Sequence, residues 1–166
     1  MKNFKNALLI LILSLSIFWQ YPLNLQASEI LYCPNEYIQI CDEMQEEYGV
    51  SSSLLIAIIQ CESSCNPKVV SNEGAIGLMQ VMPCNNPDKL NLYDPRTNIE
   101  LGTKTLLKWR ETAKNDDLLL VLSLYEGWGN TAFRKYKNEQ WDSKAFRYAH
   151  KVLDLAYEID MIRYGY

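Results

Sequence analysis

The sequence contains little of what a metal site or a nucleic-acid-binding surface requires. His150 is the only histidine among the 166 residues, and no two of the five cysteines have CxxC spacing, so no zinc site is expected. Acidic residues outnumber basic ones by 20 to 16, giving a net charge of −4 that argues against nucleic-acid binding. Internal repeats and low-complexity tracts are also absent from the sequence. Metal-centred and nucleic-acid-binding classes are therefore disfavoured.

The composition is that of one globular domain. Hydrophobic residues make up 48% of the chain and charged residues 22%, which excludes disordered and collagen-like classes. A chain of this length is large enough to bury a core of its own and too short for several domains.

The N-terminus has the features of a secretory signal peptide. Lys2 and Lys5 precede an apolar run over residues 7–19, and Ala27 offers a small residue for cleavage. The alternative, a membrane anchor, needs about 20 apolar residues, more than this run supplies. We expect residues 1–27 to be a signal peptide and residues 28–166 to form a single exported domain.

All five cysteines lie in the expected exported domain. They are Cys33, Cys41, Cys61, Cys65 and Cys84. Export leads to an oxidising compartment, so at least one disulfide is expected, although the spacing does not fix the pairing.

Helical patterning covers most of the exported part. We expect helices at about 34–48, 53–62, 94–113 and 118–125, with a last one from about 143 to 157 or beyond. Residues 63–93 carry several glycine and proline breaks and predict a loop with a small hairpin. The expected fold class is mainly α, with a small irregular or β element where we look for a site.

Glu62 stands in line with the apolar face of the second helix. Leu55, Ile58, Ile59 and Glu62 have the spacing i, i+3, i+4 and i+7, so the carboxyl group is predicted to be at least partly buried. Burial and the negative end of the helix dipole both raise the pKa of a carboxyl group. A glutamate that stays protonated near neutral pH is suited to general acid catalysis. The alternative is a structural glutamate paired with an arginine.

The segment from Gly74 to Pro83 reads Gly-Ala-Ile-Gly-Leu-Met-Gln-Val-Met-Pro. Its two glycines allow a tight turn or close approach to a ligand, and Gln80 offers an amide, so the segment could line a polar, uncharged groove. The segment lacks the Gly-Lys-Ser/Thr of a phosphate-binding loop. The alternative is a buried β-turn.

Four short stretches together indicate a family. They are Glu62-Ser63-Ser64-Cys65-Asn66-Pro67, the Gly74 to Pro83 segment, Asn98-Ile99-Glu100-Leu101-Gly102 and Tyr125-Glu126-Gly127-Trp128-Gly129. In this order they resemble the catalytic domain of the soluble lytic transglycosylases, a goose-lysozyme-like family that cleaves peptidoglycan. The resemblance covers about residues 46–155. It implies a lysozyme-like α domain that needs no metal or cofactor.

The resemblance also implies roles for single residues. Glu62 would be the only catalytic carboxylate, first an acid on the glycosidic oxygen and then a base on the muramyl 6-hydroxyl, which yields a 1,6-anhydro product. Ser63 would orient this acid. The substrate-binding residues would be Ser63, Gly77, Leu78, Met79, Gln80, Met82, Tyr125 and Tyr148. For Met79 and Met82 the alternative is a place in the core, and for Tyr125 simple packing.

The sequence departs from the family pattern at three places. Glu126 replaces the usual asparagine of Tyr-Asn-Gly, and Lys144 stands where the late motif commonly has a glutamate. Cys65 replaces a large apolar residue, with Cys61 and Cys84 flanking the same region. We expect a disulfide from Cys65 or Cys61 to Cys84, because i,i+4 geometry in a helix disfavours a Cys61–Cys65 bridge.

The sequence therefore predicts an exported, periplasmic, monomeric lytic transglycosylase. Its substrate would be the glycan strands of peptidoglycan, opened locally for an envelope-spanning secretion or conjugation machine, and nucleic acid would not be a partner. One alternative is a goose-type hydrolytic lysozyme in which Glu73 or Glu126 positions the water. Another is a non-catalytic wall-binding assembly protein.

Overall fold

The computed structural model describes residues 33–114, 117–128 and 144–165. The expected signal peptide lies outside the described residues. The helices are α3 (Asn35–Tyr48), α4 (Ser52–Ser63), α5 (Pro95–Ala113), α6 (Leu118–Ser123) and α8 (Lys144–Tyr164), with a 3-10 turn η1 (Pro83–Asn85) and a π-helical turn η2 (Leu124–Trp128). The predicted mainly α fold class is confirmed. No helix of the described part is long and apolar enough to span a membrane.

Local capping explains where the helices begin and end. The side chain of Ser51 accepts a hydrogen bond from the Leu54 N–H, and that of Asp94 accepts one from the Thr97 N–H. These bonds satisfy amide groups that have no partner within the helix. Gly49 ends α3 in the left-handed conformation, at φ 68°, as its position predicts.

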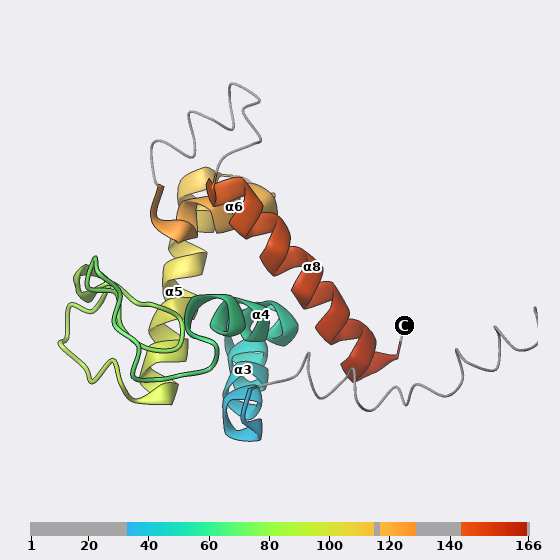
Figure 1. Cartoon of the computed structure of the whole chain (residues 1–166), viewed down its shortest axis with the longest axis horizontal. Coiled ribbons are helices and arrows are strands. Elements are labelled where there is room, and N and C mark those ends of the chain that lie inside the picture. Colours follow the sequence, from blue (N-terminus) through green and yellow to red (C-terminus); the bar gives the residue numbers. More distant parts are fainter. Residues whose placement is uncertain (1–32, 115–116, 129–143, 166) are drawn as a thin grey trace, which may run out of the picture. The chain divides into compact units, whose positions relative to one another are not determined.

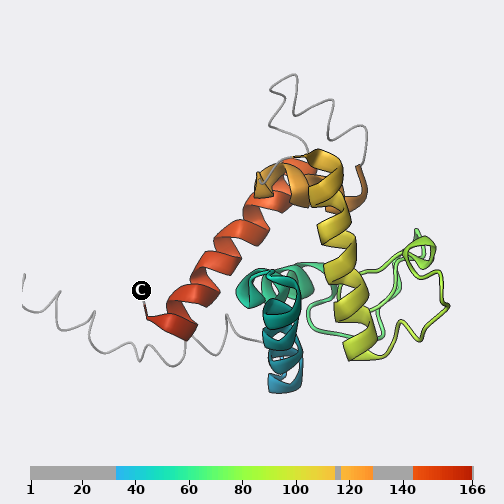
Figure 2. The same cartoon turned by 180° about the vertical axis from the view of Figure 1, so that it is seen from behind.

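Helix α4 lies at the centre of the described domain. Its residues Leu55 to Ile59 are completely buried, which is expected of a helix that is apolar on all sides. Helix α8 packs along α4 and α6, and α3 packs on α4 and α5 (Figures 1 and 2). The packing places both ends of α4 against other helices.

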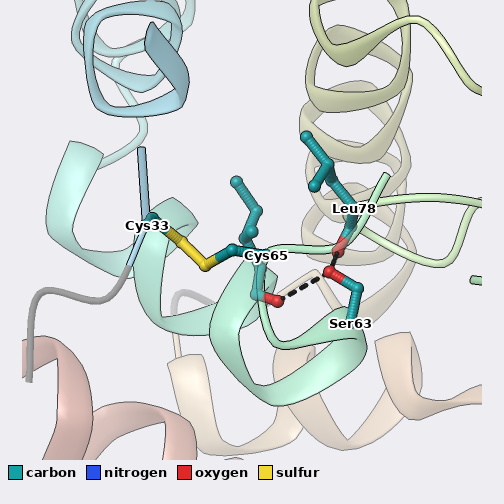
Figure 3. Close-up of a disulfide and its surroundings, with 5 residues drawn as sticks. Cys33, Ser63, Cys65 and Leu78 are labelled. Carbon is teal, nitrogen blue, oxygen red and sulfur yellow. Dashed lines mark hydrogen bonds between the residues drawn. A yellow bond between two sulfur atoms is a disulfide. The ribbon is translucent and has the colours of Figure 1, made fainter. Parts of the chain in front are cut away.

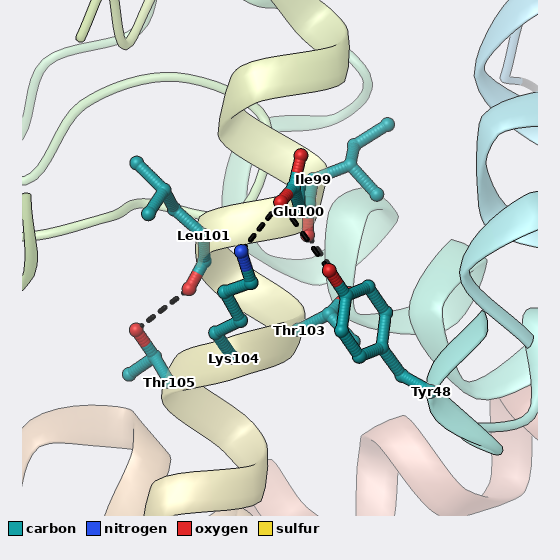
Figure 4. Close-up of polar contacts among 7 residues, drawn as sticks. All are labelled: Tyr48, Ile99, Glu100, Leu101, Thr103, Lys104 and Thr105. Carbon is teal, nitrogen blue, oxygen red and sulfur yellow. Dashed lines mark hydrogen bonds and ion pairs between the residues drawn. The ribbon is translucent and has the colours of Figure 1, made fainter.

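Polar contacts between side chains join these helices. Arg163, near the end of α8, donates to the Ser52 hydroxyl at 2.7 Å and to the Asp42 carboxylate at 2.6 Å. Tyr48 of α3 donates to the Glu100 carboxylate at 3.3 Å, and the same carboxylate pairs with Lys104 (Figure 4). The first contact holds α8 to α3 and α4, and the second holds α3 to α5.

Residues 64–94 form the irregular element that the sequence predicts. They contain two isolated antiparallel bridges, Val70 to Ile76 and Ile76 to Val81. In both views the segment lies on the side of α5 away from α8 (Figures 1 and 2). The element is thus a short hairpin-like turn within a long loop.

Asn98 of α5 holds this loop in place. Its side chain accepts a hydrogen bond from the Met79 N–H and donates to the carbonyl groups of Ile76 and Leu92, each at 2.8 Å. A Cβ atom on Gly77 would come within 2.3 Å of the Asn98 amide, so only glycine allows this approach. The Asn98 side chain replaces the strand partners that the loop lacks.

The expected disulfide pairing is wrong. Cys65 pairs with Cys33, with a Cα–Cα distance of 5.4 Å (Figure 3). Cys61 and Cys84 are free. Ser64 and Cys65 both have positive φ, 50° and 60°, so the chain leaves α4 in a tight reversal that turns Cys65 toward the start of α3. The bridge therefore joins the segment before α3 to the end of α4.

The stretch after α6 also differs from the expectation. The sequence predicts a helix to Tyr125 and a break at Gly127, whereas α6 ends at Ser123 and continues as η2 to Trp128. The wider π turn carries the chain past the glycine without interrupting the helical path, and π turns of this kind are frequent at functional sites.

Replacing Asn98 by alanine is expected to lower the free energy of unfolding by about 3 kcal/mol, because three buried backbone groups lose their partner. Urea unfolding measures the loss. The matched control is Asn72→Ala, at an exposed loop position. Equal effects of the two substitutions would contradict the assigned role of Asn98.

Replacing both Cys33 and Cys65 by serine is expected to lower the free energy of unfolding by about 3–4 kcal/mol, because the bridge closes a loop with a sequence separation of 32. Non-reducing peptide mapping should recover a peptide that links Cys33 to Cys65. A linked peptide containing Cys84 would contradict the pairing.

Candidate active site

Glu62 is the next-to-last residue of α4 and is partly buried, as its place on the apolar face predicts. The Tyr148 hydroxyl of α8 donates a hydrogen bond to Glu62 Oε1 at 2.6 Å. The hydrogen-bond partner of this carboxyl group is thus a tyrosine and not the arginine of the structural alternative. The arrangement leaves the carboxyl group in a poorly solvated place, held by one neutral donor.

The surroundings of Glu62 raise the pKa of its carboxyl group. Burial is the largest cause, and the negative charge of Glu126 adds to it. The hydrogen bond from Tyr148 and the positive charge of Lys144 act in the opposite direction without cancelling the effect of burial. The carboxyl group therefore holds its proton to a higher pH than an exposed glutamate does.

Ser63 fastens the end of α4 to the loop. Its hydroxyl lies 2.8 Å from the Leu78 carbonyl oxygen and 3.0 Å from that of Ile59 (Figure 3). A hydroxyl has one proton to donate, so the two carbonyl groups share it. The Ser63 side chain thus bonds to the loop backbone and holds the loop to the end of α4, one residue after Glu62.

Two of the expected substrate-binding side chains lie in the core. Leu78 and Met79 are fully buried, and a Cβ atom on Gly102 of α5 would come within 2.5 Å of the Met79 sulfur. Met79 thus fits the core alternative. Met82, at 37% exposed, lies at the surface.

Gln80 stabilises its own turn. Its amide nitrogen donates to the carbonyl groups of Gly77 and Val69, at 2.9 and 3.3 Å. Its φ of 47° is a left-handed conformation that a non-glycine residue adopts at a cost. The side chain offsets part of this cost with bonds to the backbone of the segment it belongs to.

Tyr125 lies between the loop and Glu62. Its hydroxyl donates to the Met79 carbonyl oxygen at 2.8 Å. Burial raises the pKa of this phenol well above its usual range, and the charge of Glu62 raises it further. The pKa of the Tyr148 phenol is raised for the same two reasons. Both tyrosines are therefore neutral hydrogen-bond donors at any working pH.

Two residues outside the expected set also belong to the surroundings of Glu62. Glu126 Oε1 and Lys144 Nζ form an ion pair at 2.7 Å. The sequence marks both positions only as departures from the family pattern. Their opposite charges are the signal that could have predicted the contact.

Asn98 is the other residue that the sequence analysis missed. Its motif is part of the family resemblance, but the role of its side chain depends on backbone atoms about 20 residues earlier in the chain. In the sequence, the only signal of that role is an asparagine near the start of an amphipathic helix.

Neither the free thiols nor the acidic residues form a metal site in the described part of the chain, where no group of three or more His, Cys, Asp or Glu could hold an ion. Cys41 is buried, which raises the pKa of its thiol to about 12. Cys84 is exposed and Cys61 is partly buried.

Solved structures of soluble lytic transglycosylases are similar to this structure. The structure is similar to the 70 kDa soluble lytic transglycosylase of Escherichia coli, with a TM-score of 0.60 and 25% identity over 74% of this chain and 24% of that one. The complex of the 70 kDa soluble lytic transglycosylase with bulgecin A gives a TM-score of 0.61 and 26% identity over 77% of this chain and 25% of that one.

Sequence comparison then gives the family. The Transglycosylase SLT domain family matches residues 39–147. Membrane-bound lytic murein transglycosylase C of Yersinia enterocolitica is 34% identical over 105 residues, covering 55% of this chain and 29% of the relative. The protein of the same name from Cronobacter sakazakii is 28% identical over 145 residues, covering 76% and 40%. The chain belongs to the Transglycosylase SLT domain family, as the motifs predict, and matches less than half the length of these relatives.

Replacing Glu62 by glutamine is expected to stabilise the protein at alkaline pH. Since the pKa of Glu62 is raised in the folded state, ionising it opposes folding, and the stability present at low pH is lost as the pH rises through the folded-state pKa. Urea unfolding should give the variant a larger free energy of unfolding than the wild type at pH 8, and this difference should become smaller toward pH 4.

The matched control for this comparison is Glu111→Gln, which removes an exposed carboxylate of α5. A Glu62→Gln variant whose difference from the wild type does not change with pH would contradict the raised pKa.

Proposed function

We propose that this chain is a peptidoglycan lytic transglycosylase with Glu62 as its single catalytic acid and base. The observation that supports the proposal most strongly is the partly buried Glu62 carboxyl, whose pKa is raised by burial and whose Oε1 accepts a hydrogen bond from Tyr148. A family relationship with lytic transglycosylases makes the glycan strand of peptidoglycan the substrate class.

The reaction has two proton transfers. Glu62 gives its proton to the glycosidic oxygen between N-acetylmuramic acid and N-acetylglucosamine as the bond from that oxygen to C1 breaks. The carboxylate then takes the proton of the muramyl 6-hydroxyl while its oxygen bonds to C1. The product is a 1,6-anhydro sugar, no water is consumed, and Glu62 ends protonated as it began. A positioned acid and base of this kind contributes about 10²–10⁴-fold to the rate.

Tyr148 supports both steps. A neutral donor on Oε1 stabilises the carboxylate that forms after the first transfer, without supplying a full positive charge that would remove the proton beforehand. The substrate's own N-acetyl group takes the place of the second carboxylate that other glycosidases use to stabilise the oxocarbenium-like state.

The loop supplies the binding surface. The backbone of Gly77, Leu78 and Met79 is fixed by Asn98 and Ser63. The side chains of Gln80 and Met82, which follow in the same segment, are not buried. We assign these groups, with Tyr125 and Tyr148, to the sugar subsites. A backbone that is already fixed loses little entropy when the glycan binds.

The cellular setting is part of the proposal. An exported, monomeric domain would act on the cell wall in the periplasm and open it locally for a secretion or conjugation machine. The apolar N-terminal segment and the disulfide between Cys33 and Cys65 support an exported protein.

Glu62→Gln is expected to lower the release of soluble fragments from purified peptidoglycan by at least about 100-fold. The amide keeps an acceptor for Tyr148 but has no proton to give. Mass spectrometry of the wild-type products should find anhydro muropeptides, which are lighter than reducing-end muropeptides by one water.

Two outcomes would overturn parts of this proposal. Equal release by the Glu62→Gln variant and the wild type would favour a non-catalytic wall-binding protein. Products with reducing ends, released by the wild type alone, would favour a hydrolytic lysozyme. Glu111→Gln is the control for the loss of a carboxylate in solvent.

A further inference from the structure

Glu126 is a buried carboxylate with only half of its hydrogen-bonding capacity used. Its side chain is 10% exposed, and Oε1 pairs with Lys144 Nζ at 2.7 Å. Oε2 is buried and makes no hydrogen bond within the described part of the chain. Buried acceptors without partners are rare in folded proteins, and each needs an explanation.

The ion pair connects the two segments that carry the tyrosines of the site. Glu126 directly follows Tyr125, whose hydroxyl bonds to the Met79 carbonyl. Lys144 comes one helical turn before Tyr148, whose hydroxyl bonds to Glu62. The pair therefore holds η2 against the first turn of α8, beside the carboxyl group that both tyrosines approach.

We propose that Glu126, held in place by Lys144, is a positioning residue of the active site that supplies a fixed negative charge beside Glu62 and so keeps the catalytic proton on Glu62. The inference rests on the proposed function and adds to it a second carboxylate that does not touch the substrate. A glutamine at position 126 could fill the same space but would supply no charge.

The charges around the site support this role. Glu126 raises the pKa of Glu62, and Lys144 lowers it. Lys144 is 71% exposed, so solvent screens its charge, whereas the Glu126 carboxylate acts mainly through the protein interior. The net effect of the pair on Glu62 is therefore that of a negative charge.

The other ionisable groups near the site come from α8, α4, η2 and the loop. Tyr148 of α8 bonds to Glu62, Cys61 lies next to it on α4, and Tyr125 faces it from η2. Glu73 of the loop acts on Lys144. Glu126 differs from these groups because it is a buried carboxylate, so its removal should have the clearest effect on the proton of Glu62.

The sign of the effect follows from the reaction. A general acid works only while it is protonated, so the rate of cleavage falls as the pH rises through the pKa of Glu62. Removing the negative charge of Glu126 lowers that pKa. The falling limb of the pH–rate profile should then move to lower pH, while the rate on the acidic side stays the same.

The test measures initial rates of muropeptide release from purified peptidoglycan between pH 4 and pH 9, for the wild type and Glu126→Gln. On the falling limb we expect the variant to be about three-fold or more slower than the wild type. On the acidic side the two rates should agree within about two-fold. Glu158→Gln, an exposed position on α8, is the control and should follow the wild type.

Each other outcome overturns the inference. A variant that is slower by the same factor at every pH would show a structural role only. A change from reducing-end to anhydro products would show that Glu126 is a base for water. If Glu126→Gln does not fold, Glu126→Asn, which is also neutral but shorter, must show the same displacement, and an unmoved limb in that variant rejects the charge effect.

Failure of the proposed function gives a different result. In that case the wild type itself releases no fragments, releases products with reducing ends, or loses no activity on Glu62→Gln. An active wild type with an inactive Glu62→Gln variant and an unmoved Glu126→Gln profile would reject only the role of Glu126.

Discussion

Burial of the Glu62 carboxyl at the end of an apolar helix is the constraint on which the site depends. Helix α4 is completely buried from Leu55 to Ile59. Glu62 lies on the same face as Leu55, two helical turns later, so its side chain cannot be fully solvated. A buried carboxyl group either gives up its charge or finds partners. Here Tyr148 supplies one neutral donor, and the proton stays on the carboxyl to a higher pH than usual. The acid strength of Glu62 is thus a property of the packing.

The binding surface that we propose beside Glu62 is a loop with almost no regular structure. Two side-chain anchors replace strand pairing: Asn98 bonds to three backbone groups of the loop, and Ser63 bonds to Leu78 beside Glu62. The Cys33–Cys65 bridge holds the end of α4 from the other side. Each anchor bonds to the backbone of the loop or holds the chain within three residues of Glu62, so loss of any of them would move the acid relative to the proposed subsites.

Much of the fold could be predicted from the sequence, because capping residues and the apolar period are local signals. The helices expected at about 34–48, 53–62 and 94–113 agree with α3, α4 and α5 to within one residue at each end, and the partial burial of Glu62 follows from its spacing. The disulfide could not be predicted, because Ser64 and Cys65 adopt a left-handed conformation that sequence reasoning reserves for glycine. The burial of Met79 and the contacts of Asn98 could not be predicted either, because they depend on atoms that are distant in sequence. Glu126 and Lys144 stood out only as two departures from a pattern, and their pairing is a tertiary contact.

The most direct measurement of the central claim is a carbon-13 NMR titration of the Glu62 carboxyl group, assigned by its absence in the Glu62→Gln variant. If burial sets its acid strength, the midpoint lies above that of an exposed glutamate, and replacing Tyr148 by phenylalanine raises it further, because the donor that favours the carboxylate is lost. A midpoint at or below the ordinary glutamate value would contradict the account.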